Sequence, residues 1–230
     1  MSEYLSPLCV SLKTVATTMV ITVILGILAA RWMARYHGKL KPLIDGIFIL
    51  PLVLPPTVVG LGLLLTFGRN GPLGHLFSLM DTTIVFSWPA TVISATVVSF
   101  PLMYMTARAA FELVDPDIED AACTLGAGRW KVFRTITLPL ARPGIIAGAI
   151  LCFARSLGEF GATLMLAGNI PGRTTTLPVA IYFAIQAGDR TRALYLTAIV
   201  LFISFASLLC LAYLRTPRRI KKIVPDMVQE

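Results

Sequence analysis

Few residues of this sequence could do chemistry, and the most conspicuous pair is Arg155 and Glu159. They lie four residues apart in the apolar stretch CFARSLGEFGATLML, so a helix would place both on one face. A charge at the centre of a lipid bilayer costs about 2.5–3.5 kcal/mol on insertion scales, so charged residues there seldom face lipid and often line a path for ions. The same spacing permits a salt bridge between the two side chains. The sequence leaves both interpretations open.

No other group of residues assembles into a recognisable reactive site. The cysteines and histidines are scattered without metal-ligand spacing, and neither histidine has a nucleophile arranged beside it. The glycine-rich loop that cradles nucleotide phosphates is also missing from the sequence. We therefore expect no catalytic residue, no metal and no cofactor, and we interpret the cysteines as small buried hydrophobes. The cysteines are Cys9, Cys123, Cys152 and Cys210, and the histidines are His37 and His75.

Composition indicates that these residues lie in a membrane protein. Apolar residues make up 56% of the 230, charged residues only 14%, and the mean hydropathy is +0.79. A helix needs about 20 mostly apolar residues to cross a hydrocarbon core of about 30 Å. We predict a single all-α transmembrane domain over residues 1–230, with five spans near residues 12–31, 43–67, 86–108, 143–167 and 193–214. A sixth apolar piece, Leu177 to Ala187, is too short to cross, and we expect it at the interface or as a re-entrant element.

The distribution of lysine and arginine predicts the orientation, because these residues are retained on the cytoplasmic side. With five spans, three basic segments fall on one side, so we predict the N-terminus outside and the C-terminus inside. The net charge of +8 is then mostly a topology signal, and we expect no nucleic-acid partner. The basic residues are Arg31, Arg35, Lys39 and Lys41 after the first span, Arg108, Arg129, Lys131, Arg134 and Arg142 after the third, and Arg215, Arg218, Arg219, Lys221 and Lys222 in the tail.

Prolines interrupt two of the predicted spans. Pro51, Pro55 and Pro56 lie in the middle of the second span, and Pro101 lies in the third. Proline removes a backbone hydrogen bond and clashes with the preceding turn, so we expect kinks or breaks there. Freed carbonyls survive in a membrane only where protein or a water-filled cavity satisfies them. The second span is therefore predicted beside a conduit, although kinks that serve packing alone would leave the same pattern.

Residues 115–142 form a soluble, basic segment between two apolar spans. Asp115 and Pro116 suit the start of a helix, and Gly126 suits its end. A second short helix is predicted from Gly128 to Ile136, with Pro139 stopping it. The pair either folds back onto the membrane domain as an ordinary loop or presents a docking surface to a cytoplasmic partner. The apolar positions are Ile118, Ala121, Ala122 and Leu125 on the first helix and Trp130, Phe133 and Ile136 on the second.

The spacing of this segment resembles the EAA loop of ABC importer permeases. In that family Glu-Ala-Ala is followed at fixed offsets by Gly and then by Ile-x-Leu-Pro, and this sequence has Asp120-Ala121-Ala122, Gly126 and Ile136-x-Leu138-Pro139. Asp120 replaces the usual glutamate, with Glu119 just before it. The resemblance implies that the segment is a coupling-helix pair that docks onto a separate ATPase subunit. The residues it implies for coupling are Glu119, Asp120, Ala121, Ala122, Leu125, Gly126, Arg129, Trp130, Phe133, Ile136, Leu138 and Pro139.

A longer stretch resembles the permeases of molybdate importers. This stretch is FARSLGEFGATLMLAGNIPGRTTTLPVAIY, residues 153–182, and LPLVLPPTVVGLGLLL and LGAGRWKVF point the same way. SLGEFGA and AGNI are shared with the related sulfate permeases, whereas NIPGRTTTLP and the short five-span chain favour molybdate. Tungstate cannot be told from molybdate here. The resemblance thus implies a type I ABC importer permease of the bacterial inner membrane that moves molybdate.

The same resemblance implies the partners and the path. Two copies would line a central pathway, two ATPase subunits would drive it, and a periplasmic oxyanion-binding protein would deliver the cargo. Arg155 could attract the oxyanion or serve only to neutralise Glu159, and the external loop 169–176 either contacts the binding protein or is simply solvated. The implied path and gate residues are Pro55, Pro56, Arg155, Ser156, Gly158, Glu159, Phe160, Gly161 and Thr163.

Two other functions remain open at this point. The cargo could be sulfate or another oxyanion. A channel or secondary transporter could also use Arg155 and Glu159 without any ATPase. Such a protein would have no need of the loop that resembles the coupling element.

Overall fold

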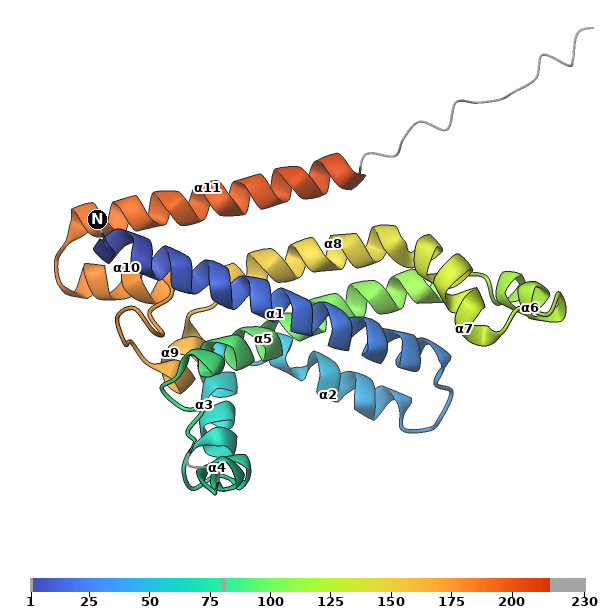
Figure 1. The fold of residues 1–230 in the computed structure, drawn as a ribbon, viewed down its shortest axis with the longest axis horizontal. Coiled ribbons are helices and arrows are strands. Elements are labelled where there is room, and N and C mark those ends of the chain that lie inside the picture. The colour runs from blue at the N-terminus through green and yellow to red at the C-terminus, as the bar shows by residue number, and fades with distance from the viewer. Residues whose placement is uncertain (1, 80–81, 216–230) are drawn as a thin grey trace, which may run out of the picture.

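The computed structural model describes residues 2–79 and 82–215, and the described part is helical without strands (Figure 1). Four helical stretches in it are long and apolar enough to cross a membrane, and a bent pair of helices makes a fifth if it counts as one span. This agrees with the predicted all-α, five-span fold. The elements are α1 (Ser2–Arg35), α2 (Lys41–Val53), α3 (Pro56–Phe67), α4 (Pro72–Ser78), α5 (Trp88–Glu112), α6 (Pro116–Thr124), α7 (Arg129–Val132), the π-helical turn η1 (Phe133–Thr137), α8 (Leu138–Leu157), α9 (Gly161–Ala167), α10 (Leu177–Gln186) and α11 (Arg190–Arg215).

The long helices α1, α5, α8 and α11 run along the long axis of the molecule, and α5 packs between α1 and α8 (Figure 1). Small residues let these helices approach closely. A Cβ atom on Gly148 would lie 2.1 Å from the Thr106 hydroxyl, and one on Gly144 would lie 2.5 Å from the Ala110 methyl group. Close backbone contact of this kind supplies the van der Waals packing that holds helices together in lipid.

Buried hydroxyl groups add a polar seam between α1 and α5. Thr14 and Thr91 are 3.0 Å apart at their hydroxyl oxygens, and the Trp88 indole N–H donates to Thr14 at 3.1 Å. Further along, the oxygens of Thr22 and Ser99 are 3.5 Å apart. Hydrogen bonds between serine and threonine side chains stabilise contacts between helices in a medium without water.

The second predicted span is broken, as its prolines predicted. Helices α2 and α3 meet at an angle of 113° around Leu54 and Pro55, and Pro56 opens α3. Pro51 lies inside α2 and Pro101 inside α5, and both of those helices continue through their prolines. After the break α3 leaves the long axis and packs on α9 (Figure 1).

The fourth predicted span, residues 143–167, is not a single helix. Helix α8 ends at Leu157, and α9 begins only at Gly161. Gly158 and Phe160 have non-helical backbone angles, and Glu159 between them uses its side chain to hold the start of α9. The prediction that Arg155 and Glu159 share one continuous helix is therefore wrong, because the helix ends between them.

The helix stop predicted at Pro139 is also wrong. The chain is helical from Arg129 to Leu157 through α7, η1 and α8, and Pro139 lies inside this run. Proline cannot donate to the preceding turn and crowds its carbonyl. The π-helical turn just before it, in which the Leu138 N–H reaches back to the Phe133 carbonyl, widens the helix at that point. The second short helix predicted in segment 115–142 therefore continues directly into α8.

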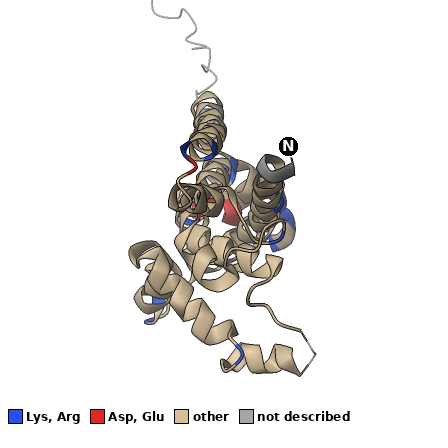
Figure 2. Ribbon diagram, turned by 90° about the vertical axis from the view of Figure 1, so that its left-hand side faces the viewer, with Lys and Arg blue, Asp and Glu red and all other residues tan. Residues whose placement is uncertain are grey.

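The C-terminal ends of α1, α5 and α11 lie at the same end of the bundle as α6 and α7 (Figure 1). The basic segments after the first and third spans thus gather at that end, and most of the basic tail follows Arg215 outside the described residues. Figure 2 views the opposite end and shows few charged segments on the ribbon. Helix α10 is ten residues long, as expected for a segment too short to cross, and packs against α11 and α1.

Candidate functional site

The charged pair inside the bundle is Arg155 and Glu159, at the break between α8 and α9. The Arg155 guanidinium lies 2.8 Å from one Glu159 oxygen, and the other oxygen accepts the Ala162 N–H at 2.8 Å. The Glu159 side chain is only 2% exposed, whereas that of Arg155 is 28% exposed. Both carboxylate oxygens therefore have partners, while the guanidinium, which carries five N–H donors, keeps donors available on its open side.

The break in the fourth span meets the break in the second. A Cβ atom on Gly161 would lie 3.0 Å from the Pro56 Cβ atom, and one on Gly60 would lie 2.8 Å from the Ala162 Cα atom. Pro55 is exposed just before this contact, and Gly158 is exposed at the end of α8. The ring of Phe160 packs near α10, with its centroid 5.1 Å from that of the Tyr182 ring.

Two predicted path residues are buried with their hydroxyl groups hydrogen-bonded inside the protein. Ser156 is buried and donates to the Cys152 carbonyl at 2.7 Å. Thr163 is buried with its hydroxyl oxygen 3.0 Å from that of Ser94 on α5. Sequence reasoning overlooked Gly60, although a glycine in an apolar span next to a proline break is a signal of close helix approach.

A second charged cluster, which the sequence analysis did not single out, joins α2 to α5. Asp45 accepts hydrogen bonds from the Tyr104 hydroxyl and the Arg108 guanidinium. Arg108 also donates to Glu112 at 2.8 Å, and Lys41 lies 3.9 Å from the same carboxylate. A lone aspartate in an apolar span was the available signal. Arg108 was interpreted only as a topology residue.

The helix pair at the end of the bundle presents an apolar surface. The Asp115 side chain accepts the Asp117 N–H at 2.9 Å and caps α6, and Gly126 ends the turn after it with a φ of +87°. Leu125 is 89% exposed and Trp130 is 68% exposed. Exposed apolar side chains that form a contiguous patch mark sites where another protein or the membrane binds.

The predicted coupling residues divide into an exposed and an inward group. Phe133 shows the inward arrangement, because its ring lies 6.1 Å from that of Phe111 on α5. The exposed residues are Asp120, Ala121, Leu125, Gly126, Arg129, Trp130 and Pro139, and the partly buried ones are Glu119, Ala122, Phe133, Ile136 and Leu138.

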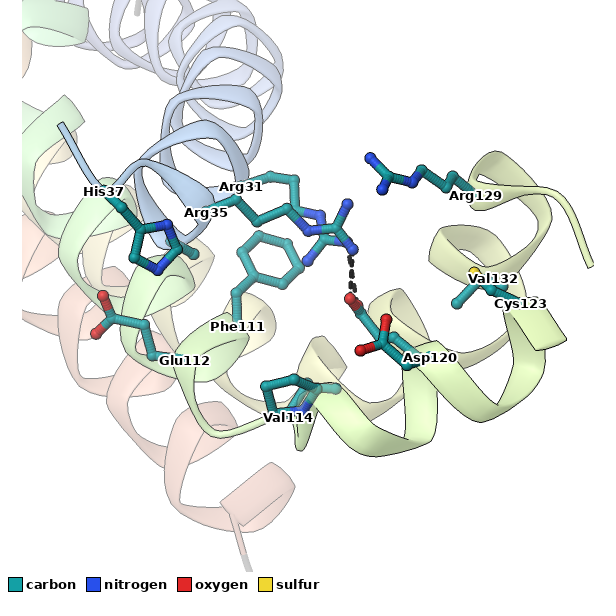
Figure 3. A pocket seen from close by; sticks show the side chains of 13 residues that line it. Arg31, Arg35, His37, Phe111, Glu112, Val114, Asp120, Cys123, Arg129 and Val132 are labelled. Carbon is teal, nitrogen blue, oxygen red and sulfur yellow. Dashed lines mark hydrogen bonds and ion pairs between the residues drawn. The ribbon is translucent and has the colours of Figure 1, made fainter.

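A cavity of about 480 Å³ lies behind the exposed surface, between α6 and the end of α1. Figure 3 shows Arg31 and Arg35 of α1 reaching across it toward α6, with Arg129 on the other side. Burial by itself would raise the pKa of Glu119 in its wall, but hydrogen bonds from Thr137 and Arg35 and the nearby positive charges outweigh it. The pKa of the Glu119 carboxyl therefore lies below its usual value, and the group stays ionised.

Residues 22–222 match the family described as binding-protein-dependent transport system inner membrane component. The chain belongs to this family. It is 48% identical over 201 residues to ModB of Escherichia coli K12, a molybdenum transport system permease protein, in a match that covers 86% of this chain and 88% of ModB. A sulfate transport system permease protein, cysT of Chlorokybus atmophyticus, is 32% identical over 87% of this chain and 70% of its own length.

Solved structures show the same fold. The bacterial alginate ABC transporter, crystallised with its periplasmic protein, matches 96% of this chain and 81% of its own with a TM-score of 0.73 at 18% identity. The MetNI methionine ABC transporter matches 92% of each chain with a TM-score of 0.64 at 16% identity. The chain is thus a multi-pass inner-membrane permease subunit with the type I importer fold, and it is non-catalytic.

Proposed function

We propose that this permease moves molybdate across the bacterial inner membrane as a homodimer driven by two copies of a separate ATPase subunit. A periplasmic oxyanion-binding protein delivers the cargo, and tungstate, which has the same shape and charge, is accepted as well. The observation that carries the choice of cargo is the greater identity to molybdenum permeases than to a sulfate permease. The predicted orientation, with α6 and α7 in the cytoplasm, puts the exposed apolar surface where an ATPase subunit would meet it.

The path for the anion runs past the two helix breaks. Arg155 is the cation that faces the oxyanion, because its guanidinium is partly exposed and pairs with Glu159 on one side. Glu159 positions that guanidinium and holds the start of α9, since both of its oxygens are bonded inside the protein. Pro55, Pro56 and Gly161 form the neighbouring wall. One partly exposed cation from each subunit gives the weak binding that lets a dianion enter and leave again.

The exposed face of α6 and α7 is the docking surface for the ATPase subunit. Leu125 and Trp130 enter a groove of that subunit and lose their contact with water, which supplies the binding free energy. When two ATPase subunits close on ATP, the docked helices move with them as a rigid body. Because α7 continues without a break into α8, this movement reaches the Arg155 site directly.

The test is uptake of labelled molybdate into vesicles that contain this chain, its co-purified ATPase subunit and the binding protein. We expect uptake that requires ATP, resists excess sulfate and is inhibited by tungstate. Uptake that sulfate abolishes would assign the permease to sulfate, the cargo of the more distant relative. Uptake without the ATPase subunit would contradict the whole proposal.

Two substitutions test the roles in the path. Arg155→Gln should abolish uptake while Arg155→Lys keeps part of it, because only the charge is retained in the second variant. Glu159→Gln should impair uptake more than it impairs assembly, because it leaves Arg155 without its counter-charge. Wild-type uptake by Arg155→Gln would remove Arg155 from the path.

A further inference from the structure

Glu119 lies on a helix that faces a partner, yet its side chain turns away from that partner. Its side chain is 14% exposed, in contrast to Leu125 and Trp130 on the same segment. The neighbouring Asp120 is exposed. An inward carboxylate on a docking helix must do something other than bind the partner.

The Glu119 carboxylate is fully engaged with other elements of the same chain. One oxygen lies 3.0 Å from the Arg31 guanidinium and accepts a hydrogen bond from the Thr137 hydroxyl, and the other pairs with Arg35. Arg31 and Arg35 come from the end of α1, and Thr137 comes from η1. One side chain therefore ties α6 to a membrane helix that is distant in sequence and to the turn that leads into α8.

Arg31 extends this cluster to α5. Its guanidinium carbon lies 5.2 Å from the centre of the Phe133 ring and 5.8 Å from that of Phe111, within the range of cation–π attraction. Its side chain is 17% exposed, so the charge is largely removed from water and depends on Glu119 for compensation. Ions held in this way fix the relative position of the elements that carry them.

Two residues of the π-helical turn η1 reach the same cluster. Phe133 and Thr137 are the first and last residues of this turn. Because residues four apart lie on one helix face, the Phe133 ring lies beside Arg31 while the Thr137 hydroxyl donates to Glu119. Single π-helical turns inside α-helices occur frequently at functional sites.

We propose that Glu119 is a positioning residue that transmits the movement of the docked helix pair to α1. The Arg31–Glu119–Thr137 cluster makes α1, α6 and η1 move as one body, so that ATP-driven displacement of α6 also shifts the membrane helix α1. This inference rests on the proposed docking of α6 and α7 onto an ATPase subunit. It differs from the role that the resemblance implies for Glu119, because the residue acts inside the chain and not at the subunit interface.

The experiment compares Glu119→Gln with wild type in the assembled transporter in vesicles. Three quantities are measured, namely the amount of ATPase subunit bound, the rate of ATP hydrolysis and the uptake of labelled molybdate. We expect Glu119→Gln to bind the ATPase subunit and hydrolyse ATP normally while its uptake per ATP falls about tenfold, the effect of about 1.4 kcal/mol of lost coupling. Glu119→Asp, which keeps the charge on a shorter stem, should restore part of the ratio.

Glu112→Gln is the matched control. Glu112 is an ion-paired carboxylate at the same end of the bundle, but it belongs to the Arg108 cluster and is 42% exposed. Its uptake per ATP should remain at the wild-type value. If Glu119→Gln keeps the wild-type ratio, the cluster transmits nothing. If Glu119→Gln loses the ATPase subunit instead, Glu119 acts at the interface or in folding. Arg31→Lys then tests the cluster independently, and unchanged subunit binding with unchanged uptake per ATP in that variant would refute it.

The failures of the two proposals are distinguishable. If wild-type permease binds no ATPase subunit, the docking proposal fails before Glu119 is tested. If wild type binds it and Glu119→Gln behaves as wild type in all three measurements, the docking proposal stands and the positioning role alone is refuted.

Discussion

The turn between α6 and α7 offers a sharp test of the docking surface, because two glycines in it differ only in backbone conformation. Gly126 has a φ of +87°, a region that favours glycine, and Gly128 has a φ of −64°. A Cβ atom built on either would meet nothing within 4 Å. Alanine at both positions thus adds the same methyl group without a clash, and only the one at Gly126 is strained.

The size of the effect follows from that strain. An L-residue in the left-handed region costs about 1–2 kcal/mol. In the free permease the exposed turn relaxes and avoids most of this cost. In the complex the partner's groove requires the original angle between α6 and α7, so the strain appears as weaker binding. We therefore expect Gly126→Ala to lower the affinity for the ATPase subunit about 5- to 30-fold, which is the factor that 1–2 kcal/mol produces, and Gly128→Ala to leave it unchanged.

The assay is equilibrium binding of the purified ATPase subunit to the permease in detergent, with thermal unfolding of each variant as the control for folding. Gly126→Asn completes the series, because asparagine tolerates the left-handed region better than alanine, and its affinity should fall between wild type and Gly126→Ala. Equal affinities for the Gly126→Ala and Gly128→Ala variants would show that the angle of this turn does not matter for docking.

Three further results are expected. Leu125→Ala should leave the thermal stability of the free permease unchanged, because the residue is 89% exposed. It should weaken ATPase binding by about 1 kcal/mol or more, a loss that only a minority of interface residues show on truncation; equal binding would exclude Leu125 from the interface. Gly60→Leu should destabilise the permease by about 1–3 kcal/mol through overpacking against α9. Gly62→Ala, whose added Cβ atom would meet nothing within 4 Å, should not destabilise it. Similar melting temperatures for both variants would refute the close contact of Gly60 with α9. The pKa of Glu119 is lowered from its usual 4.5. The free energy of unfolding of wild type should therefore exceed that of Glu119→Gln by a constant amount from neutral pH down to about 4.5, and this difference should vanish as the pH falls through the lowered pKa. A difference that disappears nearer pH 6 would contradict the ion-pair cluster.

Much of the local structure was predictable from short stretches. Asp115 and Pro116 at the start of α6 and Gly126 after its end are signals that depend on the backbone of a few residues, and the structure has the cap and the left-handed turn that they indicate. Pro55 and Pro56 likewise predicted the break between α2 and α3. Each of these signals depends on backbone sterics or hydrogen bonding within one turn, so no distant contact can override it easily.

Two helix boundaries were predicted wrongly because neighbouring structure overrode the local signal. Pro139 reads as a stop, yet the widened turn η1 before it lets the helix continue. The apolar pattern predicted one continuous helix through Gly158 to Phe160, yet the chain leaves the helix there and Glu159 holds the start of α9. Hydropathy measures how well a segment tolerates lipid and carries no information on whether its hydrogen bonds run unbroken.

Composition and helix-terminal signals were enough to predict the class of the protein, its apolar segments and the polar segment 115–142 between them, because these signals are local properties of the chain. Which charged side chains meet depends instead on how the helices pack. Arg31 and Glu119 are 88 positions apart and Asp45 and Tyr104 are 59 positions apart, and no periodicity links them. Burying a charge in this fold requires a partner at hydrogen-bonding distance, and packing of the helices alone determines which residue supplies it.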